Sequence, residues 1–356
     1  MKCFLVGALL LVVGNAFADL ARVKQPAPDL NVSRIAFGSC AFQSMEQPVF
    51  RAVVEAQPDL YLSLGDAIYG DYDIANQTAF DVTPQSLRRE WRVLAENPDW
   101  QTLVEHVPVM ATWDNHDYGH HSAGVDFPLK AESEEIFLDF FADPVASERR
   151  KRPGVYTQQL FNSEGRKVQI LLLDTRSFKS LPLLAARPDG VGGSLGKYLP
   201  NDAPGATLLG QAQWDWVSQQ MTQEVDLRII ASSGQVIADQ KGMDEWGNYP
   251  LERMRLLELI ADNPAPTVLL SGNVHFSEVS TLIVSERRIV EFTSSGLTHT
   301  NKTYSAVENP YRIAGPYVDE SFGLIEIDWQ GTDTPVVTLS AMALDGSAAF
   351  EHWMTF

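Results

Sequence analysis

Cysteine is scarce in this sequence, with only two among 356 residues. Cys3 lies in the first apolar run, and Cys40 lies in "SRIAFGSCAF", at the end of the first predicted strand. Because there is no second cysteine beyond that run, the sequence excludes a fold that is stabilised by internal disulfide bonds. Cys40 is then a buried thiol that acts as a small hydrophobic side chain, a thiol for intermolecular pairing, or a reactive or metal-bound thiol.

Basic residues are also few, since 27 lysines and arginines stand against 46 aspartates and glutamates, for a formal net charge of −19. An excess of this size disfavours stable binding to nucleic acid or to an anionic membrane. An anionic substrate would need a strongly cationic local site. No apolar run outside the first residues approaches the roughly 18 to 20 residues that a membrane-spanning helix requires, so no membrane span is expected.

The longest apolar run lies at the start, in "MKCFLVGALLLVVGNAFADLARV". One lysine, the apolar stretch Phe4–Val13 and the small-residue pattern at 16–18 are typical of a cleaved signal peptide. We therefore expect residues 1–18 to be a signal peptide that directs export to the periplasm or the medium. Residues 19–32 are expected to form an N-terminal linker, and 33–356 a single domain.

Predicted strands and helices alternate along most of the chain. Short β-rich runs such as "RIAFG" and "TVLLSG" end in glycine or acidic turns, and amphipathic segments separate them. One helix is predicted over residues 83–100, with Thr83 as N-cap and Pro84 at its first position. From residue 277 on, antiparallel strands dominate. The pattern predicts an α/β fold of two packed sheets flanked by helices, with a long loop over Arg176–Gly210.

Polar groups follow the ends of several predicted strands. In open α/β sheets, functional groups collect beyond the carboxyl ends of strands, where the loops diverge. Five apolar runs in this chain are each followed by groups that can bind a metal or a phosphate: Gly38-Ser39-Cys40, Gly65-Asp66-Ala67-Ile68-Tyr69, Trp113-Asp114-Asn115-His116-Asp117, Asp174-Thr175-Arg176 and Gly272-Asn273-Val274-His275. One such group is weak evidence, whereas the ordered set indicates a common site.

The ordered set resembles the calcineurin-like metallophosphoesterase superfamily, and its alkaline phosphatase D (PhoD-like) family in particular. The resemblance rests on the Cys and Tyr positions and on "TWDNHDYG", "LLLDTRSF", "LLGQAQWDWV" and "LLSGNVHF". It implies a four-layer α/β/β/α sandwich of two mixed sheets. It also implies a phosphatase or phosphodiesterase that hydrolyses small phosphate esters by attack of a metal-bound hydroxide. We expect a monomer.

The resemblance further implies a centre of two metal ions. Thiolate, phenolate and a bridging carboxylate are donors that suit Fe(3+), and neutral amide oxygens suit Ca(2+). The histidine is expected at the centre without assignment to either ion. The implied ligands are Cys40, Asp66, Tyr69, Asn115, Asn273 and His275.

Three further residues receive catalytic roles from the same resemblance. His116 is expected to protonate the leaving alkoxide, with Asp117 or Asp114 fixing the tautomer of its ring. Arg176 is expected to clamp a non-bridging phosphate oxygen through its planar guanidinium.

The chain departs from the family pattern at several positions. Asn115 and Asn273 stand where the family usually has aspartate, and each exchange removes one anion, so the identity of the metals stays open. Lys179 stands where an arginine is common. His120 and His121 are expected at the rim of the site.

The sequence does not decide the roles of two more side chains, Gln235 and His299. Gln235 stands where related two-metal enzymes often supply a histidine, and a supporting polar role is expected for it. His299, in "SSGLTHT", either reaches the site or belongs to an ordinary turn.

Other classes of function remain possible at this point. A binding protein on the same scaffold would hold phosphate or a metal ion without turnover. A secreted adhesin or β-rich structural protein would leave the Cys, Tyr, Asn and His positions unexplained. The retention of His116, for which a pure binder has no use, favours the enzyme.

Overall fold

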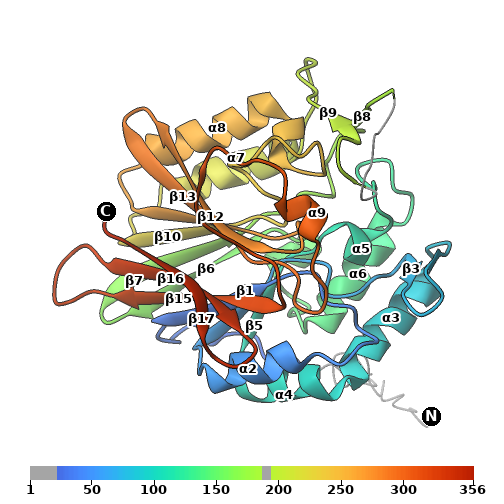
Figure 1. Cartoon of the computed structure of the whole chain (residues 1–356), viewed down its shortest axis with the longest axis horizontal. Coiled ribbons are helices and arrows are strands. Elements are labelled where there is room, and N and C mark those ends of the chain that lie inside the picture. Colours follow the sequence, from blue (N-terminus) through green and yellow to red (C-terminus); the bar gives the residue numbers. More distant parts are fainter. Residues whose placement is uncertain (1–21, 187–193) are drawn as a thin grey trace, which may run out of the picture.

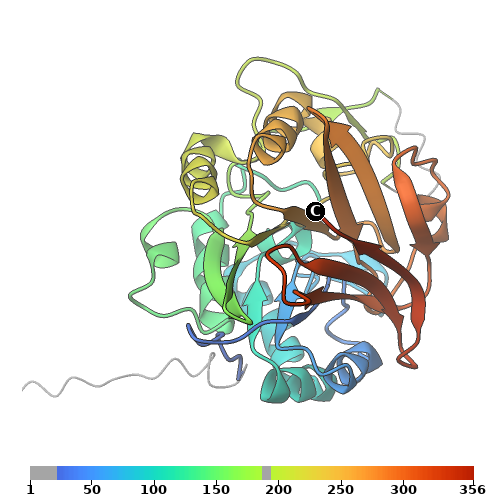
Figure 2. The ribbon, with the colours of Figure 1, turned by 90° about the vertical axis from the view of Figure 1, so that its left-hand side faces the viewer.

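The computed structural model describes residues 22–186 and 194–356. The signal peptide expected at 1–18 lies outside the described residues, as does part of the long loop expected over Arg176–Gly210. Two large mixed sheets lie face to face in the middle of the molecule, and helices cover the outer face of each (Figures 1 and 2). This is the four-layer α/β/β/α arrangement that the sequence predicts.

The first sheet has six strands, of which β1, β2 and β5 are parallel and the last three strands of the chain are antiparallel to their neighbours. Its order is β17 (Ala348–Met354), β16 (Val336–Ala343), β15 (Ser321–Asp328), β1 (Arg34–Gly38), β2 (Leu60–Ser63) and β5 (Val109–Ala111).

The second sheet has seven strands, of which β7, β10, β11 and β13 are parallel. Its order is β14 (Arg312–Tyr317), β12 (Ser277–Val284), β13 (Arg287–Thr293), β11 (Thr267–Ser271), β10 (Leu227–Ala231), β7 (Arg166–Leu172) and β6 (Thr157–Ser163). The hairpin of β12 and β13 is the first part of the strand-rich tail that the sequence predicts.

Helices and short ribbons complete the described chain. The helices are α2 (Pro48–Glu55), α3 (Pro84–Glu96), α4 (Pro98–His106), α5 (Asn115–Tyr118), α6 (Lys130–Phe140), α7 (Gly210–Met221), α8 (Pro250–Ala261) and α9 (Lys302–Ser305), with 3₁₀ turns η1 (Glu148–Lys151) and η2 (Trp246–Asn248). Two ribbons pair β3 (Tyr72–Asp73) with β4 (Thr78–Ala79) and β8 (Leu183–Leu184) with β9 (Tyr198–Leu199). None of the helices in the described parts of the chain has the length and apolarity needed to cross a membrane.

Alternation along the strands divides the core into layers. Ile35 and Phe37 of β1 face the second sheet, whereas Ala36 between them packs beneath the helices α2, α3, α4 and α6. In β10 the pattern repeats, because Ile229 faces the first sheet and Ile230 packs against α7 and α8. Strands buried on both faces explain the continuous apolar runs in the sequence.

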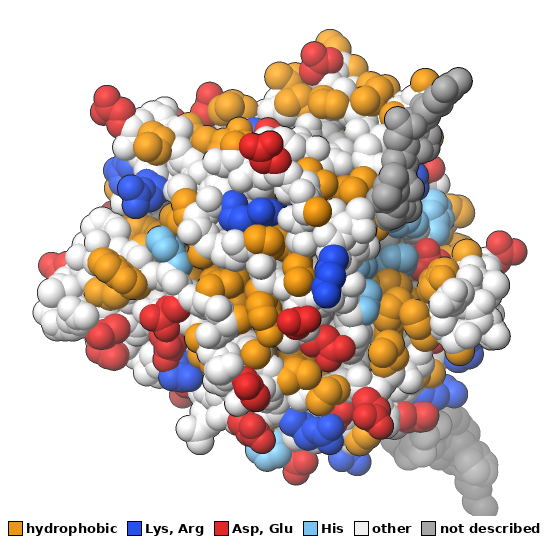
Figure 3. Space-filling view, viewed as in Figure 1, with side chains coloured by type: hydrophobic (Ala, Val, Ile, Leu, Met, Phe, Trp, Pro, Cys, Tyr) orange, Lys and Arg blue, Asp and Glu red, His pale blue; other side chains and the backbone are white. Residues whose placement is uncertain are grey.

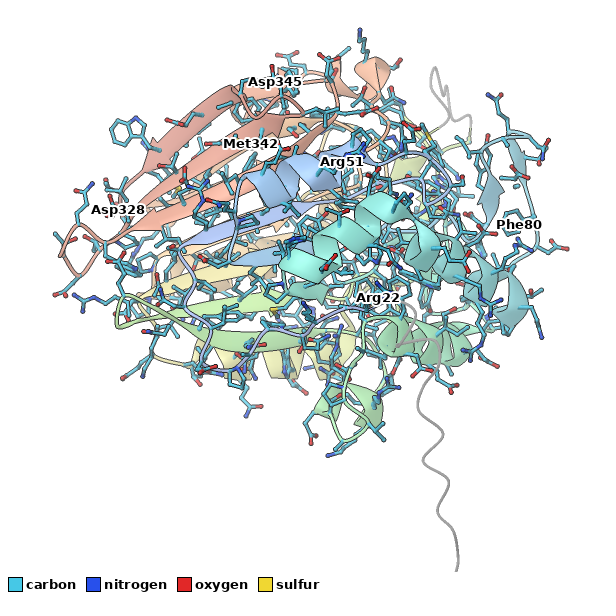
Figure 4. The ribbon with its side chains drawn as sticks, turned by 90° about the horizontal axis from the view of Figure 1, so that it is seen from below. Arg22, Arg51, Phe80, Asp328, Met342 and Asp345 are labelled. Atoms are coloured by element: carbon cyan, nitrogen blue, oxygen red, sulfur yellow. The ribbon has the colours of Figure 1, made fainter. Side chains whose placement is uncertain are left out.

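The view from below shows how the tail joins the first half of the chain. In Figure 4, the labelled Arg51 of α2 and Met342 of β16 mark two elements from opposite ends of the sequence. Met342 packs against the cluster that contains Val49 and Phe50 of α2. The C-terminal strands are therefore an integral part of the first sheet.

The helix predicted over residues 83–100 is wrong in its extent. It ends at Glu96, because Asn97 has extended backbone angles and its side chain accepts the N–H groups of Asp99 and Trp100 to begin a second helix, α4. The predicted start is confirmed, since Thr83 caps α3 and forms a capping box with Ser86.

The N-terminal segment expected as a linker is packed against both sheets where it is described. The carbonyl of Lys24 accepts the N–H of Val109 in β5 at 2.9 Å, and the N–H of Val32 donates to Asn162 in β6 at 2.8 Å. Each of these two strands is one of the two edge strands of its sheet. The segment thus ties the sheets together on one side.

Candidate metal centre

The carboxyl ends of the central strands of both sheets meet at one edge of the sandwich. The N–H of Cys40, after β1, donates to the carbonyl of Gly65, after β2, at 3.2 Å. The N–H of Gly296, which follows β13 of the second sheet, donates to the carbonyl of Ser39 at 3.1 Å. Backbone hydrogen bonds therefore fix the loops of the two sheets against each other.

Four of the expected ligands occupy the left-handed backbone region, which residues other than glycine seldom adopt. The φ angles are 64° at Cys40, 50° at Asp66, 70° at Asn273 and 59° at His275. Such conformations cost of order 1–3 kcal/mol each and concentrate at functional sites, where the surroundings enforce them. The strain at these strand ends supports a site built from them.

Two glycines allow the loops to approach closely. Gly65 has φ 103°, and a Cβ there would lie 2.5 Å from the backbone nitrogen of Asp114. A Cβ at Gly272 would lie 2.3 Å from Oγ of Ser39. Both glycines therefore keep β-carbons out of the contacts through which neighbouring strand ends bring their ligands together.

Cys40, Asp66 and His275 form a cluster of three possible metal ligands, whose ligating atoms all lie within 4.8 Å of one another. The Cys40 sulfur is 3.5 Å from Oδ2 of Asp66 and accepts the hydroxyl of Ser295 at 3.2 Å. Burial raises the pKa of Asp66 to about 7 and also raises the pKa of the Cys40 thiol. Without a cation, burial disfavours two anions this close, so this donor set suits a metal ion.

Tyr69 belongs to the same cluster. Its side chain is buried, and burial, together with the neighbouring Cys40 and Asp66, raises the pKa of its phenol. The hydroxyl lies 3.0 Å from Nε2 of His299, and the ring stacks on that of His116 with centroids 4.3 Å apart. Tyr69 therefore lies between Cys40 and Asp66 on one side and His116 and His299 on the other.

Asn273 has an amide orientation that suits a cation. Its Nδ2 donates to the carbonyl of Asp244 at 2.8 Å, and its backbone N–H donates to Oγ of Ser39. Because the amino group is used in this way, the amide oxygen points elsewhere and is free to bind a cation.

Two neighbouring polar atoms are buried without a hydrogen-bond partner among the described residues: Oδ2 of Asp114 and Nδ2 of Asn115. A flip of the unpaired Asn115 amide would bring its oxygen to the position of Nδ2. A bound ligand is one way in which such buried polar groups can be satisfied. These residues therefore fit a second cation.

His116 is held by two carboxylates. Its Nδ1 lies 2.5 Å from Oδ1 of Asp71, and its backbone N–H donates to Oδ1 of Asp66 at 3.2 Å. Burial opposes its protonation, but Asp66 and Asp71 outweigh burial and raise the pKa of His116 to about 9. Asp71 was not among the expected residues. The signal was the second Gly-Asp pair in "GDAIYGDYD".

Asp117 does not orient the His116 ring as expected. Its carboxylate accepts the backbone N–H groups of Asp66, Ala67, Ile68 and Asp114. Asp117 therefore fixes the loop that carries Asp66, and Asp71 takes the role expected of Asp117 or Asp114.

Arg176 also differs in its surroundings from what was expected. Its side chain is buried, and its guanidinium donates to the carboxylates of Asp114 and Asp244. Asp244 in addition accepts Nζ of Lys179 at 2.6 Å. A phosphate clamp needs an open guanidinium, whereas this one is enclosed in a network of two cations and two anions beneath the centre.

Comparison with known proteins places the chain in a family. The profile of the PhoD-like phosphatase family matches residues 35–320. The chain belongs to this family. It is accordingly a hydrolase of phosphoric ester bonds, and membership implies metal dependence.

One solved structure shares the fold of this chain. A structure described as that of PhoD matches with a TM-score of 0.68 at 18% sequence identity, over 93% of this chain and 70% of that chain. A putative 5′-nucleotidase from Staphylococcus aureus in complex with alpha-ketoglutarate gives only 0.38 at 10% identity, over 91% of this chain and 54% of the other. No relative was found among the curated proteins.

Two further histidines of this PhoD-like chain, His299 and His121, lie near the centre. His299 stacks on Phe42, and its ring centroid lies 4.4 Å from that of His275. His121 lies 6.1 Å from His116 by the same measure. Histidine atoms are visible together on the right of the face shown in Figure 3. His120 is exposed, in line with the rim position expected for it.

Gln235 is fully used by protein partners. Its Nε2 donates to Glu278 and Thr293, and its Oε1 accepts Nζ of Lys241 at 2.7 Å. Both ends of the Gln235 amide therefore have hydrogen-bond partners without any contact to the metal centre. This placement agrees with a supporting role.

Proposed function

We propose that this PhoD-like chain is an exported, metal-dependent phosphoesterase that hydrolyses phosphate monoesters or diesters at the edge where the two sheets meet. The observation that carries the proposal is the convergence of Cys40, Asp66 and His275, with ligating atoms within 4.8 Å of one another. His116 adjoins this cluster through its hydrogen bond to Asp66.

The ligands proposed for two ions, Fe(3+) and Ca(2+), divide by chemistry. Cys40 and Tyr69 would hold the first ion, Asn115 and Asn273 the second, and Asp66 would bridge them. His275 offers a neutral imidazole, because burial lowers its pKa to about 3. When bound, such a pair of cations activates water and offsets the charge that builds on a phosphoryl group.

His116 is the proposed proton donor to the departing oxygen. Asp71 holds Nδ1, so the other ring nitrogen, Nε2, is left to face the substrate. The carboxylates around the ring favour the protonated form, which a general acid requires at the start of the step. Arg176 is proposed to act through Asp114, by neutralising that carboxylate and holding its free oxygen in place.

Turnover of nitrophenyl phosphate and bis-nitrophenyl phosphate by metal-analysed protein tests the proposal. We expect hydrolysis by the metal-loaded enzyme and loss of both bound metal and turnover in Asp66→Asn. Asp73→Asn, in an exposed turn of the same region, is the matched control and is expected to keep both. Full metal occupancy without turnover of any phosphate ester would refute the proposal.

Export is tested separately by N-terminal sequencing of the secreted or periplasmic chain. Cleavage after the small-residue pattern predicts a mature chain that begins at Asp19. An intact N-terminus on the active protein would contradict export through a cleaved signal peptide.

A further inference from the structure

Two segments meet beside His116 and form a wall of the site. One is Gly119–Leu129, which follows α5, and the other leads into β9, on the same side of the molecule in Figure 1. Oγ of Ser122 lies 2.7 Å from the hydroxyl of Tyr198, and Nε2 of His121 lies 3.4 Å from Oγ of Ser194. Side-chain hydrogen bonds therefore hold the two segments against each other.

This wall is joined to the proposed general acid through one carboxylate. Oδ1 of Asp71 binds Nδ1 of His116, and Oδ2 of the same side chain accepts the backbone N–H of His121 at 3.1 Å. The rings of His116 and His121 are 6.1 Å apart. Because His116 is proposed to protonate the leaving group, the surface next to it faces the leaving group.

Lys197 brings a positive charge to this wall. Its Nζ donates to Oγ of Ser122 at 3.3 Å and lies 5.2 Å from the ring centroid of Tyr198. It forms no ion pair among residues 22–186 and 194–356, although this acidic chain offers carboxylates in excess. Its charge is also among the causes that keep His121 neutral, which places it close to that ring.

The setting of Lys197 differs from that of the other cations near the centre. Arg176 and Lys179 are buried and neutralised by Asp114 and Asp244. Lys197 is only partly buried, and one hydroxyl uses one of its three N–H donors. A partly desolvated ammonium with free donors and no direct ion pair within the described residues is suited to bind an anionic group of a ligand.

We propose that Lys197, Ser122 and His121 form a subsite for the leaving group, and that it favours phosphate esters whose leaving group carries a second anionic group. A carboxylate or a further phosphate there would accept the ammonium of Lys197 and the hydroxyl of Ser122. The neutral ring of His121 completes the subsite as a hydrogen-bonding partner. This inference rests on the proposed function.

A matched pair of esters tests the subsite. Phenyl phosphate and 3-carboxyphenyl phosphate differ by one carboxylate on the leaving group. We expect the wild-type enzyme to show a kcat/KM about fivefold higher for the carboxylated ester, the effect of one charge pair at a partly exposed site. Lys197→Ala should bring the ratio to about one, Lys197→Arg should keep it, and the exposed control Lys167→Ala should leave it unchanged. Turnover of phenyl phosphate should be unchanged in the Lys167→Ala control.

Binding of the corresponding phosphonates, phenylphosphonate and 3-carboxyphenylphosphonate, measures the same ratio by calorimetry without turnover. If neither ester is hydrolysed, the proposed function fails while the phosphonate ratio still decides the subsite. A wild-type ratio of about one, or an unchanged ratio in Lys197→Ala, would overturn the inference.

Discussion

A cysteine thiolate 3.5 Å from a buried, ionised carboxylate is unfavourable unless a cation lies between them. The same holds for Tyr69, whose phenol pKa is raised by burial and by the Cys40 and Asp66 groups next to it. The single described cysteine of this chain is therefore better explained as a ligand than as a small hydrophobic side chain. Metal binding must release protons from these groups, so metal affinity should rise with pH.

Asp71 is the residue whose role can be separated most cleanly from metal binding. Asp71→Asn should lower kcat by about 10²-fold, because the ring of His116 loses the carboxylate that favours its protonated form and orients it. Metal content should stay the same, and esters with poor leaving groups should be slowed more than nitrophenyl esters. Steady-state kinetics over a series of leaving groups checks this.

Asp73→Asn is the control for that experiment, since Asp73 caps an exposed turn two residues away. An equal slowing of all esters in Asp71→Asn would indicate a structural role only. Loss of metal in Asp71→Asn would also contradict the proposal that Asp71 acts on His116 and not on metal binding.

One contribution to the pH dependence of stability comes from His121, which burial keeps neutral. Burial lowers the pKa of His121 to about 4, below its ordinary value of about 6.5 in the unfolded chain. Between these values the unfolded chain binds a proton that the folded chain rejects, so stability falls as pH drops from about 6.5 towards 4. Urea unfolding of the metal-free wild-type chain and of a His121 variant at several pH values isolates this contribution to the slope.

His121→Gln should reduce that slope, and the exposed His106→Gln should leave it unchanged. An identical slope in wild type and His121→Gln would show that this ring does not contribute.

At the scale of single elements, helix ends explain where the sequence predicted well and where it did not. The start of α3 carries a Thr-Pro signal that was interpreted correctly. The break at Asn97 was missed, although an asparagine before a proline is itself a cap and a helix stop. The amphipathic pattern continues across the break and conceals it.

Thr83→Ala should destabilise the protein by about 1 kcal/mol, because the N–H of Ser86 loses its acceptor. Thr83→Ser keeps the hydroxyl and should be close to wild type. Both variants should have normal kcat, since the cap lies outside the proposed centre. Chemical denaturation monitored by circular dichroism checks the stability, and equal midpoints for the two variants would contradict the capping role.

The strand ends show how much of the site a sequence contains. Apolar runs in the sequence predicted the strands β1, β2, β5, β10 and β11. The loops that follow these strands could therefore be predicted to meet, and they carry Cys40, Asp66 and Asn273. The orientation of side chains within a loop could not. Asp117 and Arg176 bond to neighbouring loops rather than to the positions expected for them, because their partners depend on tertiary packing.

At the scale of the whole molecule, the centre depends on the contact between two sheets. The rings of Phe37 in β1 and Phe292 in β13 meet edge to face, with centroids 5.0 Å apart. Edge strands such as β6, β14 and β17 were not predicted individually, since their alternation is weaker and only pairing with a neighbour selects them. The fold class could be predicted because the central strands are buried on both faces.

Phe292→Leu should destabilise the protein by about 1 kcal/mol or more through loss of ring contacts between the sheets. Metal affinity should also fall, because Cys40 and Asn273 come from different sheets. Exposed Ile283→Ala in the same hairpin serves as the control. Denaturation midpoints and metal titration check both effects, and a destabilised Phe292→Leu with unchanged metal affinity would show that the centre tolerates movement between the sheets.

The most direct test of the account is the location of metal in crystals of the purified chain by anomalous scattering. Two neighbouring peaks are predicted, the first in contact with the sulfur of Cys40 and the carboxylate of Asp66, the second beside the amides of Asn115 and Asn273. A catalytically active crystal with fully occupied metal elsewhere, and none touching Cys40 or Asp66, would contradict it.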